Sequence, residues 1–195
     1  HQHSALPTKT EIDSVIHATK VAKEHAEKFG ALVIQDEGGR MKPINTFASE
    51  LLRKLSGKDK YEDMSANQVF LSMMLNPAAW YNVDLIALGK EQNDSIRKVI
   101  GVPLGTEFVK ATDFFDNNRE YKLRPYLEKA TSTNNPNKFE QDFKKVGERL
   151  SLLNVALSGT MVKIFPLLND ENNKWVSAVE YRSGNYQVQD SLYSN

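Results

Sequence analysis

The sequence predicts a mainly α-helical fold of the α+β class, with a small β-hairpin and a long C-terminal helix as its spine. The first observation is a run of apolar residues three or four positions apart, the spacing of one helix face. This run comprises Phe139, Phe143, Val146, Leu150, Leu153, Leu157, Met161 and Ile164. The second observation is the pair Gly38-Gly39 between two short apolar stretches, which is typical of a hairpin turn.

The N-terminal element is predicted to be a helix that a capping box opens. Thr8 and Glu11 have the spacing at which two residues satisfy each other's exposed backbone N–H groups. Apolar residues at intervals of three and four continue to Phe29, and Gly30 is a natural residue to close a helix. We therefore expect one helix from Thr8 to Phe29.

The hairpin should follow at once, with strands over residues 31–35 and 40–44. Pro43 lacks a backbone N–H, so the second strand should lie at an edge of its sheet. A helix from about residue 45 to residue 56 comes next, in which we expect Glu50 to pair with Arg53 and Lys54.

Further capping and turn signals place the remaining elements. Ser65 and Gln68 form a second capping box, whose helix should stop before Pro77. Shorter helices are predicted over residues 94–100 and 121–130. The long helix should extend from about residue 137 to residue 164 and end at Pro166, with a final strand around residues 186–188.

Composition limits the function classes. The 195 residues suit one soluble domain, and 25 basic against 25 acidic residues give a net charge of zero. This balance argues against broad attraction to nucleic acid or anionic membranes. The absence of cysteine excludes disulfides, thiolate-bound zinc and thiol catalysis. No apolar run approaches the ~20 residues of a membrane span. The chain opens at His1, and we interpret it as a segment of a longer protein.

Histidines are the first candidates for a metal or haem site. His17 and His25 are eight residues apart on the predicted first helix, a rise of about 12 Å. One metal ion on a helix needs partners four residues apart, so we predict no metal site. His25 flanks the apolar face of this helix, which favours a packed, structural histidine. The alternative is that His25 or His17 serves as a single axial haem ligand.

No enzyme site is visible. Asp36 and Glu37 precede Gly38-Gly39, but these glycines lead into a strand, whereas a phosphate-binding loop leads into a helix. Adjacent acids in a turn also diverge, while glycosidases need two carboxyl groups that face each other across a cleft. No spacing of nucleophile and base supports a reaction.

Two segments carry a family resemblance. In residues 25–54 it rests on His25, Ala26, Phe29, Gly30, Gln35, Asp36, Gly39, Arg40, Lys42, Pro43, Thr46, Glu50, Leu52, Arg53 and Lys54. Residues 65–80 and scattered later positions, among them Lys145-Val146 and Glu148-Arg149, add to it. These residues resemble the extracytoplasmic segment of a bacterial membrane-protein family. It is the fused cytochrome c biogenesis protein of the system II type, which exports haem and ligates it to apocytochromes c.

The resemblance implies a single soluble domain, residues 1–195, on the periplasmic side of the cytoplasmic membrane, within a larger membrane protein. It implies apocytochrome c and other parts of the haem ligation complex as partners, and no nucleic acid. The family handles haem through a tryptophan-rich loop and histidines near membrane helices, and this chain has only two tryptophans. We therefore expect no cofactor in this segment, although the parent protein would handle haem. Gly147 stands where the resemblance leads us to expect an acid.

The resulting hypothesis is a non-catalytic scaffold or docking domain for haem delivery. The hairpin would offer an edge strand to a partner, through Gln35, Asp36, Arg40, Lys42 and Glu50. The alternative for these residues is that Asp36, Arg40 and Glu50 bond locally and hold the hairpin against the next helix.

Two other functions stay open. A haem-binding relay predicts that His25 or His17 is exposed beside an apolar cleft. A generic ligand-binding or sensor domain predicts a closed pocket lined by residues such as Trp80 and Phe115.

Overall fold

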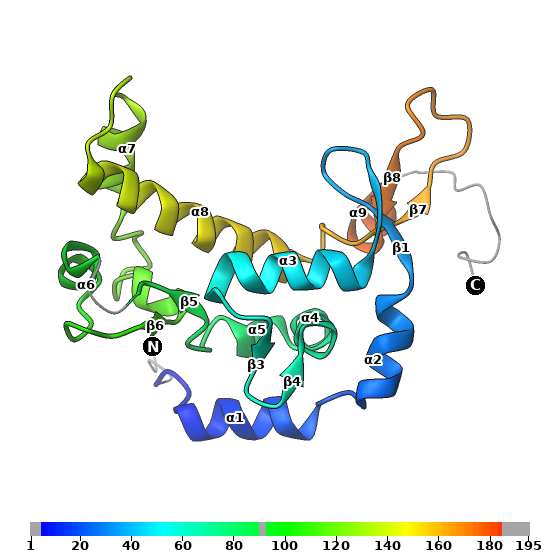
Figure 1. Ribbon diagram of the computed structural model, residues 1–195, viewed down its shortest axis with the longest axis horizontal. Coiled ribbons are helices and arrows are strands. Elements are labelled where there is room, and N and C mark those ends of the chain that lie inside the picture. The colour runs from blue at the N-terminus through cyan, green and yellow to red at the C-terminus, as the bar shows by residue number, and fades with distance from the viewer. Residues whose placement is uncertain (1–4, 90–92, 185–195) are drawn as a thin grey trace. The chain divides into compact units, whose positions relative to one another are not determined.

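The computed structural model describes residues 5–89 and 93–184 (Figure 1). The predicted strand at 186–188 lies outside these residues. The predicted class is confirmed, because helices dominate and the largest sheet is a small antiparallel one. Contacts within the chain define two compact units. Unit 1 contains residues 1–19, 53–58 and 78–153, and unit 2 contains residues 20–52, 59–77 and 154–195.

Unit 1 contains most of the middle of the chain. Its elements are α1 (Lys9–Ala18), α5 (Pro77–Trp80), β5 (Ile86–Ala87), α6 (Asp94–Ile100), β6 (Phe108–Val109), the 3₁₀ helix η1 (Ala111–Phe114), α7 (Arg124–Thr131) and most of α8 (Lys138–Ser158). The predicted capping box between Thr8 and Glu11 opens α1. Trp80, Phe114 and Phe143 are fully buried and are the largest apolar side chains of this core.

The contact of α7 with α8 explains the glycine at position 147. Tyr126 of α7 stacks on Phe143 of α8, with ring centroids 4.7 Å apart. One turn further along α8, a Cβ at Gly147 would come within 3.0 Å of the Leu127 side chain. A side chain at this position would require Leu127 to shift, so the close approach of the two helices favours glycine over the acid expected beside Glu148.

Unit 2 contains the hairpin and the largest sheet. Its elements are α2 (Lys23–Gly30), β1 (Val33–Gln35), β2 (Met41–Pro43), most of α3 (Ile44–Ser56), β3 (Lys60–Tyr61), β4 (Met64–Ser65), α4 (Ala66–Leu75), β7 (Lys163–Pro166), β8 (Trp175–Ser177) and α9 (Ala178–Ser183). The sheet order is β2-β1-β7-β8, and α9 contacts β7 and β8 (Figure 1). β2 is an edge strand, as Pro43 predicted.

The predicted single helix from Thr8 to Phe29 is wrong, because α1 ends at Ala18 and α2 begins at Lys23. Residues between them make contacts that compete with helix continuation. Lys20 pairs with Asp63, and the Val21 carbonyl accepts a hydrogen bond of 2.9 Å from Gln68 Nε2. This carbonyl is therefore satisfied without an intrahelical partner.

Gly30 has a different role from the one predicted. It is the last residue of α2 and is buried, and a Cβ on it would lie 2.5 Å from Asn67 Nδ2 of α4. The absence of a side chain thus permits close packing of α2 on α4 rather than the closing turn of a helix.

The long helix is shorter than predicted. α8 ends at Ser158, Gly159 follows with φ +78°, and residues 163–166 form β7 instead of a last helical turn. Pro166 is the final residue of this strand and does not end a helix. Pairing of β7 with β1 and β8 prevails over the apolar helical spacing of Met161 and Ile164. The role of α8 as a spine stays a prediction.

Candidate functional site

The tight turn of the β1–β2 hairpin is built around one carboxylate. Asp36 N–H donates to the Arg40 carbonyl at 2.8 Å, and Gly39 N–H donates to the Asp36 carbonyl at 3.0 Å. The Asp36 carboxylate also accepts the Arg40 backbone N–H at 2.9 Å. Gly39 has φ +78°, a conformation that favours glycine. The turn is therefore specified by Asp36 and Gly39.

Lys42 joins the turn to α3. Its Nζ lies 3.1 Å from Glu50 Oε2 and 3.4 Å from Asp36 Oδ2. The Arg40 backbone N–H and then Lys42 lower the pKa of Asp36, and the hydrogen bond to Glu50 raises the pKa of Lys42. Local bonds thus hold the hairpin against the helix, but Lys42 makes them rather than the Arg40 side chain. Glu50 pairs with Lys42 across elements, where the sequence predicted Arg53 and Lys54.

The other two predicted partner residues differ sharply in exposure. Gln35 is 7% exposed, and its amide bonds to Gly39, Asn173 and Trp175 inside unit 2. The Arg40 side chain is exposed, and among the described residues no carboxylate lies within 4.0 Å of it. The structure therefore presents Arg40 to solvent and uses Gln35 internally.

The hydrogen-bond pattern of the hairpin defines its free edge. At one end the Ile44 N–H donates to the Leu32 carbonyl at 2.8 Å, and at the other the Asp36 N–H donates to Arg40. Hydrogen-bonded pairs alternate along an antiparallel ladder. Lys42 opposite Ile34 is therefore the bonded pair between these ends.

This register directs the backbone polar groups of the two residues next to Lys42 away from β1. The N–H and carbonyl of Met41 and the carbonyl of Pro43 point away from β1, at the edge of the sheet. The hairpin also exposes three apolar side chains, Leu32 before β1, Val33 in β1 and Met41 in β2, by 54%, 46% and 48% respectively. We call the β2 backbone with Leu32, Val33, Met41 and exposed Arg40 the edge surface.

His17 and His25 are exposed and lie on separate helices. His17 lies on α1 in unit 1 and His25 on α2 in unit 2, so the expected distance along one helix does not apply. His25 is not packed, contrary to the expectation of a buried structural role. Within residues 5–89 and 93–184, no cluster of three or more His, Asp or Glu side chains is arranged to hold a metal ion.

Trp80 and Phe115, which were expected to line a sensor pocket, differ in their exposure to solvent. Trp80 is fully buried in the core of unit 1, whereas Phe115 is 41% exposed and packs on Tyr121 at a centroid distance of 5.5 Å. These two aromatic side chains thus take part in core and surface packing respectively.

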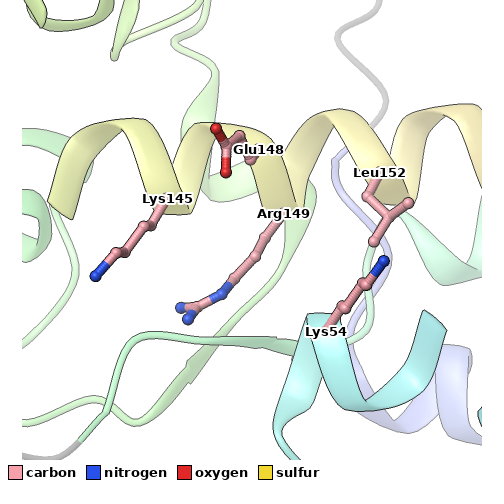
Figure 2. A pocket seen from close by; sticks show the side chains of 5 residues that line it. All are labelled: Lys54, Lys145, Glu148, Arg149 and Leu152. Carbon is pink, nitrogen blue, oxygen red and sulfur yellow. The ribbon is translucent and has the colours of Figure 1, made fainter. Parts of the chain in front are cut away.

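A second site was missed by the sequence analysis. A cleft of about 450 Å³ in unit 1 is lined by Lys54, Lys145, Glu148, Arg149 and Leu152 (Figure 2). The available signal was the pair Lys145 and Arg149, two like charges four residues apart on one helix face. The contribution of Lys54, some 90 residues earlier, could not be read from spacing.

The described residues thus form a mainly helical α+β fold, with an open sheet edge in unit 2 and a basic cleft in unit 1. No protein-family model matches the chain. Over 164 residues, 83% of its length, the chain is 38% identical to protein NrfI of Wolinella succinogenes, of which it covers 18%. The chain therefore corresponds to less than a fifth of the length of this relative.

Proposed function

We propose that this chain is a non-catalytic, extracytoplasmic domain of a cytochrome c biogenesis membrane protein. In this role it acts as a scaffold or docking surface for haem delivery to apocytochrome c. Homology to NrfI supports a role in cytochrome c maturation. The periplasmic location and the membrane-embedded parent follow from the family resemblance. None of the helices in residues 5–89 and 93–184 combines the length and the hydropathy that a bilayer span requires.

The observation that carries the docking role is the edge surface. An unpaired strand edge is a template for another extended chain, and proteins usually protect such edges. Here β2 is only three residues long and carries Lys42 and Pro43, which limits the open edge. Met41 nevertheless keeps one outward N–H and one outward carbonyl. An extended segment of apocytochrome c would add beside β2 through these groups. Apolar side chains of that segment would cover Leu32, Val33 and Met41.

The charges of the edge surface favour an acidic group next to the apolar segment. Lys42 is occupied by Asp36 and Glu50, so it is not available to a partner without breaking two ion pairs. Arg40 is exposed beside Met41, and its guanidinium can donate two parallel hydrogen bonds to a carboxylate of the partner. We therefore assign partner recognition to Arg40 and the β2 edge, and positioning of the turn to Asp36, Lys42 and Glu50.

Replacing Met41 by proline tests the docking role. The substitution removes the outward N–H but leaves the bonded pair of Lys42 and Ile34 in place. Binding of an unfolded apocytochrome c to the full-length protein, measured by fluorescence anisotropy, should weaken at least about threefold, because a backbone hydrogen bond contributes ~1 kcal/mol.

Two charge substitutions provide the matched comparison for this experiment. Val33→Asp puts a charge into the edge surface, whereas Val155→Asp puts it on α8 at a site of similar exposure. We expect only Val33→Asp to weaken binding. Equal affinities for wild type, Met41→Pro and Val33→Asp would contradict docking at this edge.

A further inference from the structure

The cleft in unit 1 gathers three cations from two helices. Lys54 comes from the C-terminal end of α3, and Lys145 and Arg149 come from one face of α8. Figure 2 shows Lys145 and Arg149 extending from the same side of α8, with Lys54 reaching toward Leu152. Glu148, also of α8, lines the cleft beside these cations and adds one carboxylate to it.

The cleft has an excess of positive charge, because three cations line it against the single carboxylate of Glu148. No carboxylate in that part lies within 4.0 Å of the Lys54, Lys145 or Arg149 side chains. Like charges four residues apart disfavour a helix by ~0.2–0.5 kcal/mol. The negative end of the α3 dipole offsets the charge of Lys54. It cannot do so for Lys145 and Arg149, which lie in the middle of α8.

The Arg149 side chain is anchored by a hydrogen bond to strand β5 of unit 1. Its Nη1 donates to the Ala87 carbonyl of β5 at 2.6 Å, and the side chain is half-buried. A guanidinium has five N–H donors in a planar fork, so one bond to a carbonyl fixes its orientation and leaves others for a ligand. The two exposed lysines can move to meet an anion beside this fixed group.

We propose that the cleft binds a small organic anion that carries at least two negative charges on carboxylate or phosphate groups. Arg149 takes one oxyanion in a bidentate pair, and Lys54 and Lys145 neutralise the second charge. Leu152 supplies an apolar wall for the body of the ligand. The volume of about 450 Å³ falls within the range of small-molecule sites. This binding site is independent of the docking role proposed for the edge surface.

Calorimetric titration of the full-length protein with citrate and with inorganic phosphate tests the site. Trimethyl citrate, which has a similar body without the carboxylate charges, is the ligand control. Citrate or phosphate should bind saturably and trimethyl citrate should not, and higher salt should weaken the binding. Tighter binding of citrate would identify a carboxylate ligand, and tighter binding of phosphate a phosphate ligand.

Matched variants place the binding in this cleft. Lys54→Gln and Lys145→Gln should each lower the affinity for the anion about threefold, as expected for the loss of one exposed charge pair. Neither lysine has a hydrogen bond or ion pair among the described residues that its loss would break. Lys144→Gln, on the same helix but outside the lining, should leave the affinity unchanged. The proposal is overturned if neither anion binds up to about 10 mM, or if Lys144→Gln weakens binding as much as Lys145→Gln.

Discussion

Replacing Arg97 by alanine is expected to lower the free energy of unfolding by about 3–5 kcal/mol, because the substitution removes a buried guanidinium together with its hydrogen bonds. Arg97 is fully buried in unit 1. Its Nη1 lies 2.9 Å from Asp94 Oδ1, its Nε donates to the Thr106 carbonyl at 2.8 Å, and its Nη2 donates to the Gly89 carbonyl. Alanine would leave these groups without their donor and open a cavity.

Equilibrium urea denaturation measures this effect. Arg97→Lys keeps the charge but cannot reproduce the three directed bonds, so its stability should fall between those of wild type and Arg97→Ala. Arg124→Ala is the matched control, because Arg124 is exposed and only pairs with Glu120 at 3.7 Å. It should cost less than about 1 kcal/mol. A loss below about 1 kcal/mol for Arg97→Ala would mean that this arginine does not organise its loops.

Replacing Gln35 by alanine should have the second largest effect, a loss of about 2–4 kcal/mol for three buried hydrogen bonds. Gln35 Nε2 donates to the carbonyls of Gly39 at 3.2 Å and Asn173 at 3.0 Å, and its Oε1 accepts the Trp175 N–H at 2.7 Å. One amide thus ties the hairpin turn to the loop before β8 and to β8 itself.

Amide hydrogen exchange locates the consequence of this change. Gln35→Ala should speed exchange of the Trp175 N–H, which loses its acceptor, along with the stability loss in urea. Gln141→Ala is the control, because Gln141 is exposed and its amide donates only to the nearby Pro136 carbonyl. Unchanged stability and unchanged exchange in Gln35→Ala would contradict the internal structural role of Gln35. The partner-binding role predicted from the sequence would then be the remaining interpretation.

Local sequence signals predicted local structure well. The capping boxes at Thr8 and Ser65 are present, and the helix after Ser65 stops before Pro77. Pro43 lies in an edge strand, and the short helix over residues 94–100 has the expected bounds. Each of these features depends on residues within a few positions of one another, so spacing alone carries the information.

Features that depend on distant partners were not predictable from spacing. Residues 163–166 have helical apolar spacing, but they pair with β1, some 130 residues earlier, and with β8. The break after Ala18 likewise depends on Gln68 reaching the Val21 carbonyl. In the candidate sites, the partner-binding role predicted for Asp36 and Lys42 stays a prediction. The ion pairs of Lys42 with Asp36 and Glu50, the internal role of Gln35 and the contribution of Lys54 to the cleft required the folded chain.

The amount of covalently haem-bound cytochrome c in cells tests the proposed function most directly, measured by haem staining of membrane and periplasmic fractions. Cells that lack the full-length protein should contain little haem-bound cytochrome c, and the wild-type gene should restore the normal amount. Met41→Pro at equal protein abundance should restore only part, because the edge surface would no longer dock its partner. Normal levels of haem-bound cytochrome c in cells without the protein would contradict a role in cytochrome c maturation.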